Sequence, residues 1–323
     1  MDRIGRGRWL RRVWVLLLMS VMQDTALWAQ RGLQTGAQRG AQSGARVDWR
    51  ADDPARLAWL EAHGRRVSRT HVVLTVPRDS MHAAHQEALA DSLERGLHAL
   101  HELVQSPRTW QRHGKAAVHI VLAPGLFVSH ANGDGTVFIP FSVAARGEAP
   151  YLHESAHVLL TAPAPFFVWE HDTPAARQVV GNSTAQWLLE GLPNLLAARA
   201  AQAAGLREYN LFATTAAGSV HATCAERTRE APRAAMREAV GREGMVDGLN
   251  GEARGELAPA YYTCAESFVT FLVDQLGLEA VVELAPHMTH DTWRTALERL
   301  AAASLEELQA LWQKHLEAAA RRE

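Results

Sequence analysis

The first half of the chain contains short apolar runs with the length and composition of β-strands. Residues 71–76, HVVLTV, and residues 116–122, AVHIVLA, each form such a run, and both predict strands. A third short strand is predicted within residues 132–143, where the turn residues NGDG precede TVFIP. Pro140 lies in this third strand and has no amide hydrogen to donate, so we expect the strand at an edge of the sheet.

A helical period replaces the strand pattern in three segments. Apolar residues spaced by three and four positions predict a helix over residues 80–104. A second helix is expected over about residues 148–161, where the segment TAPAP ends it. The third is expected over about residues 184–204, and it is interrupted or begins near Pro193.

The C-terminal part of the chain has an irregular pattern that gives way to helices. Residues 205–257 contain many glycines and charged residues, which favours irregular structure. From Pro259 onward the pattern is helical, with breaks near Gly277, Pro286 and Ser304.

The order of these elements indicates the fold class. Strands dominate the first half and helices the second, which is the arrangement of an α+β fold. We therefore expect one domain over residues 51–323, with a small mixed β-sheet in residues 51–182 and a mainly helical lobe in residues 183–323. The hydrophobic content of the whole chain, 47%, is sufficient for a sizeable core.

Residues 1–29 have the pattern of a secretory signal peptide. Several arginines precede the apolar run VWVLLLMSVM, residues 13–22, and the segment ALWA offers a cleavage position after Ala29. Residues 30–50 are rich in Gln, Gly, Ala and Arg, which predicts a flexible linker. We therefore expect export to a periplasm or the extracellular space, with no membrane span in the mature chain. The alternative is an uncleaved signal that anchors the protein to a membrane by its N-terminus.

Charge and cysteine content narrow the choice of partners. The formal net charge is −2, from 33 basic and 35 acidic residues. We expect no nucleic-acid partner, because such proteins usually carry a basic excess. The chain has two cysteines, Cys224 and Cys264. In the oxidising compartment that a signal peptide implies, we expect them to form a disulfide. Two buried free thiols are the alternative.

The segment YLHESAHVLL, residues 151–160, contains the pattern His-Glu-x-x-His. Positions four residues apart lie on one face of a helix, so His153 and His157 can direct their imidazoles at one metal ion. Glu154 lies about 100° further around the helix, where its carboxylate can take a proton from water beside the metal. Chance alone gives roughly 0.06 matches to this pattern in such a chain. The alternative to a metal site is that His153 and His157 are two histidines that form ordinary hydrogen bonds.

A catalytic zinc ion typically has three protein ligands, so a third ligand has to come from elsewhere in the chain. The extended pattern HExxHxxGxxH is excluded, because Leu160 and Pro163 occupy the positions of its Gly and its last His. Two later segments offer suitable side chains. These are WEHD, residues 169–172, and WLLEGLPNLLAAR, which contains Glu190. We favour Glu190, because a ligand on a helix is held more rigidly than one on a loop.

The motif HESAH at residues 153–157, together with WLLEG at residues 187–191, resembles the gluzincin zinc metallopeptidases. This group includes the thermolysin-like and aminopeptidase-like enzymes and the broader peptidase-MA-like proteins. The resemblance covers residues 70–315, and residues 260–277, AYYTCAESFVTFLVDQLG, are similar to a tyrosine-containing helix of that group. It implies a thermolysin-like catalytic domain, zinc as cofactor, and a peptide or protein as substrate.

The same resemblance implies roles for particular residues. His153, His157 and Glu190 correspond to the ligands of the zinc ion. Glu154 corresponds to the general base, which takes a proton from the attacking water and later gives it to the leaving amine.

Two residues near Glu190 depart from the family pattern. Pro193 replaces a helix-favouring residue, and since proline is tolerated in the first turn of a helix, we expect Glu190 at the very start of its helix. Thermolysin-like enzymes have an acid at the position of Asn194, where it orients a ligand histidine. An amide oxygen can accept the same imidazole N–H bond, although more weakly.

The resemblance also implies that a residue within 260–277 donates a hydrogen bond to the oxyanion. Tyr261 and Tyr262 both lie there on apolar faces, and the pattern does not choose between them. We take Tyr262 as the predicted donor, with Tyr261 and the loop residue His171 as alternatives. In these families the substrate lies along the strand before the HExxH helix, which corresponds here to residues 137–141.

The sequence therefore predicts an exported zinc metallopeptidase that hydrolyses peptide bonds. The alternative is a catalytically silent, metallopeptidase-like domain that binds or scaffolds other proteins in the cell envelope. The intact Glu154 favours the enzyme, because a domain without turnover needs no general base. No pocket motif distinguishes endopeptidase from exopeptidase action.

Overall fold

The computed structural model describes residues 53–104, 117–126, 128–132, 135–160, 185–207, 219–230, 254–287 and 292–322. The predicted signal peptide, the predicted linker and the WEHD segment lie outside these residues. Within the described part the fold is α+β, which confirms the predicted class. None of the described helices is both long enough and apolar enough to cross a membrane.

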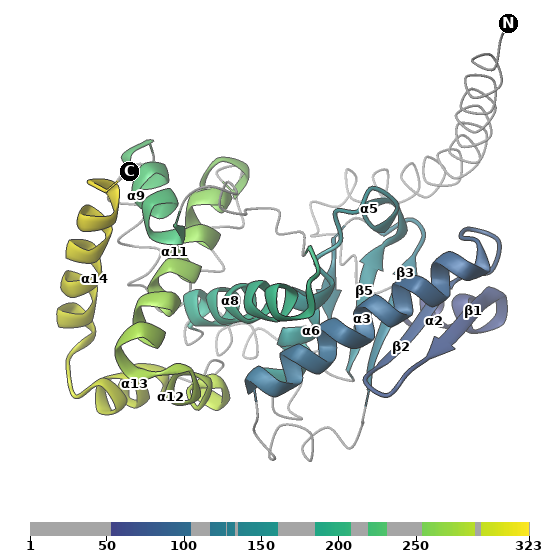
Figure 1. Ribbon diagram of the computed structural model, residues 1–323, viewed down its shortest axis with the longest axis horizontal. Helices are drawn as coiled ribbons and strands as arrows, with labels where there is room; N and C mark the ends of the chain where they lie inside the picture. The colour runs from purple at the N-terminus through teal and green to yellow at the C-terminus, as the bar shows by residue number, and fades with distance from the viewer. Residues whose placement is uncertain are drawn as a thin grey trace, which may run out of the picture.

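One mixed sheet of five strands forms the right-hand part of the molecule in Figure 1. The strands are β1 (Gly64–Ser68), β2 (Val72–Pro77), β3 (Val118–Ala123), β4 (His130–Ala131) and β5 (Thr136–Pro140). Their order across the sheet is β1-β2-β3-β5-β4. β2, β3 and β5 are parallel, whereas β1 is antiparallel to β2 and β4 is antiparallel to β5. The two strands expected at residues 71–76 and 116–122 are thus confirmed as β2 and β3.

β5 does not lie at the edge of the sheet, so this part of the sequence prediction was wrong. The short strand β4 covers it, pairing Ala131 with Val137 and His130 with Phe138. Pro140 is tolerated because it is the last residue of β5, beyond the two positions that β4 covers. The predicted substrate-binding segment, residues 137–141, is not a strand over its whole length, because Phe141 is the first residue of α5.

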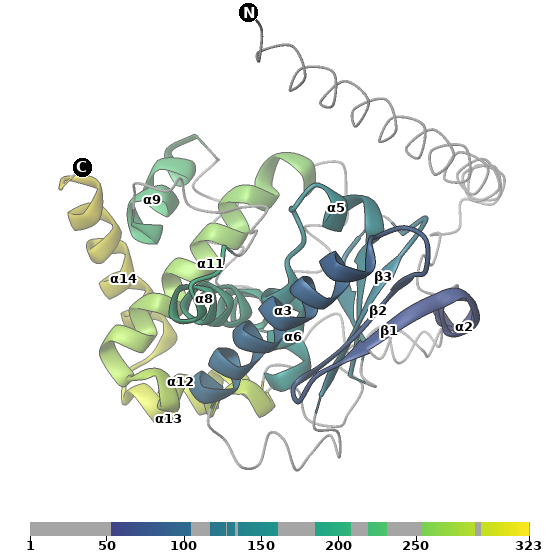
Figure 2. The ribbon, with the colours of Figure 1, turned by 45° about the vertical axis from the view of Figure 1, so that its right-hand side comes forward.

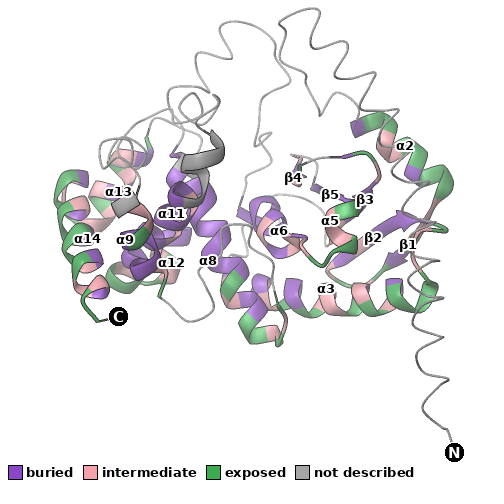
Figure 3. Cartoon of the chain, turned by 90° about the horizontal axis from the view of Figure 1, so that it is seen from above, coloured by how far each residue is buried: buried purple, intermediate pink, exposed green. Residues whose placement is uncertain are grey.

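Helices cover both faces of the sheet and form most of the other described residues. They are α2 (Asp53–His63), α3 (Ala83–Val104), α5 (Phe141–Ala145), α6 (Tyr151–Leu160), α8 (Gln186–Ala204), α9 (Val220–Glu230), α11 (Arg254–Leu276), α12 (Leu278–Val282), α13 (Trp293–Ala301) and α14 (Leu305–Ala320). A short 3-10 helix, η1 (Ala285–His287), precedes α13. Figure 3 shows α2 and α3 on opposite faces of the sheet.

Successive residues of the central strands point to two different cores, as the period of two in a strand requires. Leu74 and Ile120 belong to the main core, which the buried faces of α3, α6 and α8 share. Val121 and Phe138 belong to a smaller core under α2, where they contact Leu60. Both faces of the sheet are therefore buried, which explains why β2 and β3 have almost continuous apolar sequences.

α8 lies at the centre of the molecule and connects the sheet to the helical lobe. It packs against α3 and α6 and also against α11, and Figures 1 and 2 show it between these elements. Every residue from Trp187 to Ala197 is buried. A helix that is apolar on all sides is expected where it forms the middle of a core.

α8 continues without a break through Pro193, although we expected the helix to begin or break there. Glu190 therefore lies one turn into the helix rather than at its very start. Proline cannot donate the hydrogen bond that the carbonyl group of Leu189 would otherwise accept. The complete burial of Leu192 and Leu196 on either side of the proline offsets that loss.

The expectation of irregular structure over residues 205–257 was wrong for the part that forms α9. α9 has the polar sequence VHATCAERTRE and lacks an apolar stripe, so periodicity does not reveal it. The breaks expected near Gly277 and Ser304 are confirmed. Gly277 has a positive φ of 86° directly after α11, and the side chain of Ser304 caps α14 by accepting a hydrogen bond from the amide of Glu307.

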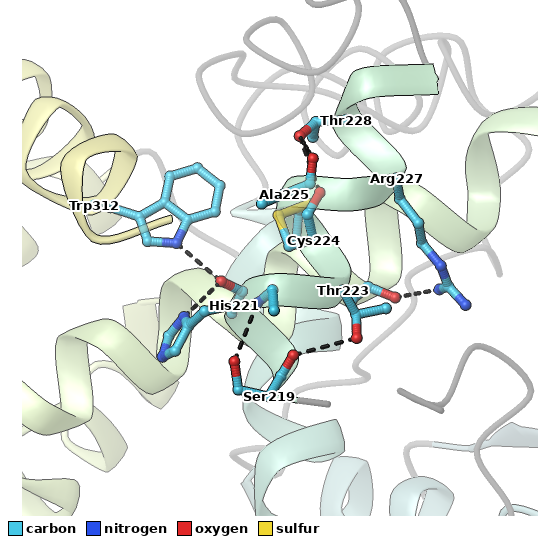
Figure 4. Close-up of a disulfide and its surroundings, with 12 residues drawn as sticks. Ser219, His221, Thr223, Cys224, Ala225, Arg227, Thr228 and Trp312 are labelled. Carbon is cyan, nitrogen blue, oxygen red and sulfur yellow. Dashed lines mark hydrogen bonds between the residues drawn. A yellow bond between two sulfur atoms is a disulfide. The ribbon is translucent and has the colours of Figure 1, made fainter. Parts of the chain in front are cut away.

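A disulfide between Cys224 and Cys264 joins α9 to α11, as predicted (Figure 4). The two Cα atoms are 4.9 Å apart, within the ordinary range for a disulfide. Close to it, Arg227 of α9 donates a hydrogen bond to the hydroxyl group of Thr263 in α11. Covalent and polar links therefore fix α9, rather than an apolar face.

A buried polar network adds α14 to this pair of helices. The Oγ atom of Ser267 in α11 lies 2.9 Å from Nδ1 of His221 in α9 and accepts a hydrogen bond of 3.0 Å from Nε1 of Trp312 in α14. Figure 4 shows His221 and Trp312 meeting at this point. α11 is thus held in place from two sides, which matters because it also borders the site described next.

Candidate metal centre

α6 presents the two histidines of the HESAH motif on one face. The rings of His153 and His157 lie one turn apart, with centroids separated by 4.7 Å and planes nearly perpendicular. Their Nε2 atoms are 3.1 Å apart. His157 is buried, and His153 keeps only 14% of its side-chain surface exposed. Both imidazoles therefore direct the same ring nitrogen at one enclosed point.

α8 brings the carboxylate of Glu190 to this point. Its Oε2 atom lies 3.5 Å from Nε2 of His153 and 3.6 Å from Nε2 of His157. One ligand atom from each of the three residues lies within 4.8 Å of the others. These residues form a group that could hold a metal ion, and it is the one such group among the described residues. The structure thus brings together all three predicted ligands, from two helices.

The electrostatics of Glu190 favour an ionised carboxylate. Burial alone would raise its pKa, but the hydrogen-bonding capacity and charge of His153 and His157 outweigh burial and lower the pKa to about 2. The charged form is therefore stabilised by the same two imidazoles that would share a metal ion with it.

Glu154 lies beside this group on α6 and is 8% exposed. Its backbone amide donates to the carbonyl of Pro150 as part of the helix start. No hydrogen bond or ion pair engages its carboxylate within the part of the chain that the structure describes. The side chain is thus enclosed next to the two histidines without belonging to the ligand triad.

The other residues of the WLLEG motif explain how Glu190 is positioned. The ring of Trp187 packs edge-on against Phe268 of α11 and Trp293 of α13, with centroid distances of 4.9 and 5.6 Å. Gly191 lies so close to the backbone of Ala265 in α11 that a Cβ atom would overlap its carbonyl group. A glycine here permits close approach of the two helices. The motif therefore fixes α8 against α11 immediately beside the ligand.

The two candidate tyrosines have different environments. Tyr261 is 1% exposed, and its hydroxyl group is buried without a hydrogen-bond partner among the described residues. Burial, followed by the charge of Glu190 and the neighbouring Tyr262, raises the pKa of Tyr261 well above its usual value. Tyr262 is only partly buried, and the two rings meet edge-on at 5.3 Å. Tyr261 thus lies near Glu190, and Tyr262, which contacts Tyr261, is the more accessible of the two.

Two further sequence expectations concern residues near the ligands. Asn194 is buried, but its Nδ2 atom has no hydrogen-bond partner within the described segments, and no bond links Asn194 to a ligand histidine there. The orienting role expected for Asn194 is therefore not observed. Glu170 and His171, weighed as a ligand and as an oxyanion donor, lie outside the described residues.

The sequence interpretation did not identify Glu266 as part of this region. This residue lies on α11, one turn after Tyr262, and the charge of His153 acts on its carboxyl group. The signal that could have revealed it is a carboxylate within the run YYTCAESFVTFL, whose other members are uncharged.

No known protein family matches this chain, and neither a curated protein nor a solved structure is significantly similar to it. The chemical interpretation of the metal centre therefore depends on its own residues and their geometry.

Proposed function

We propose that this chain is a zinc-dependent peptidase of the gluzincin type. The convergence of His153, His157 and Glu190 carries this proposal. Donor atoms around a tetrahedral zinc ion lie about 3.4 Å apart, given bond lengths of about 2.0–2.2 Å. The distances between the three donor atoms here are 3.1, 3.5 and 3.6 Å. Two imidazoles and one carboxylate are also a common ligand set of catalytic zinc.

Glu154 acts as the general base in this proposal. A zinc ion at the site would supply Lewis acidity, which acidifies a water molecule and polarises the scissile carbonyl group. The carboxylate of Glu154 accepts the proton of the attacking water and later delivers it to the leaving amine. Its place next to His153 supports this role, because a general base has to lie within reach of the water that it deprotonates.

Tyr262 donates a hydrogen bond to the oxyanion that forms when water adds to the carbonyl. Partial accessibility supports this assignment over Tyr261, whose hydroxyl group is sealed in the interior. Tyr261 instead lies near Glu190, whose charge adds to the effect of burial in raising the pKa of this tyrosine.

The architecture supports a gluzincin-like arrangement, with a sheet before the HExxH helix and a helical lobe after it. The substrate peptide would bind near the end of β5, since α6 packs against β4 and β5. Because β4 already pairs with Val137 and Phe138 and Ile139 is fully buried, we assign this contact to Phe141, which follows β5 and is partly exposed. Export is part of the proposal, and the disulfide supports it because disulfides persist in oxidising compartments.

Metal analysis and peptide hydrolysis test this function together. The exported chain should contain about one zinc ion per molecule and cleave members of a peptide library. Glu154→Gln should keep the zinc but lose hydrolysis by at least about a hundredfold. Glu279→Gln is a matched control, because Glu279 is exposed on α12 and is not one of the three residues grouped at the metal centre. Absence of zinc would refute the proposal. Zinc without hydrolysis by the unmodified chain would favour the silent binding domain.

A further inference from the structure

Glu266 occupies the point where α11 crosses the ligand end of α8. It follows Ala265, the residue whose backbone touches Gly191, and Gly191 directly follows Glu190. Residues four apart share a helix face, so Glu266 lies on the same side of α11 as Tyr262. The contact between the two helices therefore places a third glutamate beside the metal centre, in addition to Glu154 and Glu190.

Glu266 is neither an exposed surface residue nor a fully buried core residue. Its side chain is partly accessible, yet it is enclosed deeply enough that burial raises its pKa to about 7, against the opposite effect of the charge of His153. Its neighbours Ala265, Phe268 and Val269 are apolar and buried. An enclosed carboxylate in such surroundings is costly unless a partner compensates its charge.

The described residues do not provide that partner. The hydroxyl group of Thr270 donates a hydrogen bond to the backbone carbonyl of Glu266, and this bond does not involve the carboxylate. No cationic side chain in the described segments forms an ion pair with its carboxylate. Because burial favours the neutral form of the Glu266 carboxyl group, a cation beside it would stabilise the ionised form. The centre therefore favours a ligand with a positive charge.

We propose that the carboxylate of Glu266 binds a cationic group of the substrate next to the scissile bond. This inference depends on the proposed peptidase function, because it places that cation on a peptide held at the metal centre. An ammonium or guanidinium group forms charge-assisted hydrogen bonds with a carboxylate. In a peptide such a group comes either from the free N-terminus or from a lysine or arginine side chain. Glu266 thereby selects substrates by charge, without taking part in bond cleavage.

Peptide binding to the zinc-loaded full chain with Glu154→Gln tests this inference without requiring turnover. Calorimetry would compare matched peptides with a free or an acetylated N-terminus, and acetylated peptides that contain lysine or norleucine. We expect cationic peptides to bind at least about tenfold more tightly than their neutral counterparts. Adding Glu266→Gln should remove this preference and leave the affinity for neutral peptides unchanged. Preference for the free N-terminus identifies an α-amino group as the ligand, and preference for lysine identifies a side chain.

Two controls keep the interpretation of this experiment unambiguous. Glu279→Gln in the same background should preserve the preference for cationic peptides, because Glu279 is exposed on a different helix, α12. Equal zinc content in all variants shows that the metal centre is intact. Equal affinity for cationic and neutral peptides, or a preference that survives Glu266→Gln, overturns the inference. Failure of the peptidase proposal gives a different result, since the unmodified zinc-loaded chain would then hydrolyse no peptide.

Discussion

Gly191 of α8 lies directly against the backbone carbonyl of Ala265 in α11, at a distance that leaves no room for a side chain. We expect Gly191→Ala to push the two helices apart and to move Glu190, the adjacent residue. The better helix propensity of alanine offsets only about 1 kcal/mol of the overlap. The variant should lose about 1–3 kcal/mol of unfolding free energy and bind zinc more weakly. Denaturant unfolding and chelator competition measure the two effects.

Ala198→Ser provides the control for this variant, because Ala198 lies on the exposed side of the same helix. A surface substitution of this kind should change the unfolding free energy by less than about 0.5 kcal/mol. Wild-type stability together with wild-type zinc affinity in Gly191→Ala would contradict the tight contact between α8 and α11.

Zinc should stabilise the folded protein, because its three ligands come from two helices that separate on unfolding. At a zinc concentration about 100 times the dissociation constant, the gain is about 2.7 kcal/mol. Glu190→Ala should remove most of this gain, since it deletes the ligand that α8 supplies. Glu170→Ala should retain it. Thermal unfolding with and without zinc measures the effect, and the reverse ranking of the two variants would move the third ligand to the WEHD segment.

The sequence predicted the convergence of His153, His157 and Glu190 better than it predicted the surrounding fold. The spacing of His153 and His157 determines their common face once α6 forms, because helix geometry alone sets it. Glu190 could be assigned through the motif around it, but its position one turn inside α8 could not. Pro193 suggested a helix start. The helix continues through this proline because burial of the surrounding residues stabilises it.

Features that depend on contacts between distant segments were not predictable from local patterns. α9 has no apolar period, and it is fixed by the bond from Cys224 to Cys264 and by its contact with Ser267. β4 has only two residues, too few to give a recognisable strand pattern. Pro140 therefore suggested that β5 is an edge strand, although β4 pairs with part of it. Glu266 becomes noticeable only when α11 packs beside the ligands, because a single carboxylate in a helix has many possible environments.

Tyr262→Phe should reduce kcat by about a hundredfold to a thousandfold, which is the usual effect of removing one oxyanion donor. Zinc content should not change, because the hydroxyl group of Tyr262 is not a ligand in the triad. Tyr261→Phe is the matched control on the adjacent position. It should keep activity and slightly raise stability, since it removes a buried hydroxyl group without a partner among the described residues. Loss of activity in Tyr261→Phe alone would reverse the assignment.

The double substitution Cys224→Ser and Cys264→Ser should destabilise the protein by about 4 kcal/mol, the value that chain entropy gives for a loop of this size. Reduction of the unmodified chain should have a comparable effect. Because the bond holds α9 against the helix that carries Tyr262 and Glu266, activity should fall at temperatures where zinc is still bound. Denaturant unfolding under oxidising and reducing conditions measures the difference, and equal stability in both conditions would show that the bond does not form.

His221 should make the helical lobe less stable in acid. Its burial, and then the charge of His315 on α14, lower its pKa from 6.5 to about 4, while Asp274 on α11 acts in the opposite direction and Arg322 adds to the lowering. The unfolded chain therefore binds a proton more readily than the folded one between these two pH values. Stability from the neutral His221 is fully present above pH 6.5 and is lost as the pH falls toward 4.

Comparing the His221→Gln variant with the wild type separates this effect from the titration of other groups. Both proteins contain those groups, including His153 and His157. The difference in unfolding free energy between wild type and variant should shrink by on the order of 1–2 kcal/mol as the pH falls from about 7 to about 4, with allowance for partial solvent access. His63→Gln, at an exposed position in α2, should show no such change. A difference for His221→Gln that stays constant across this range would mean that His221 titrates normally in the folded protein.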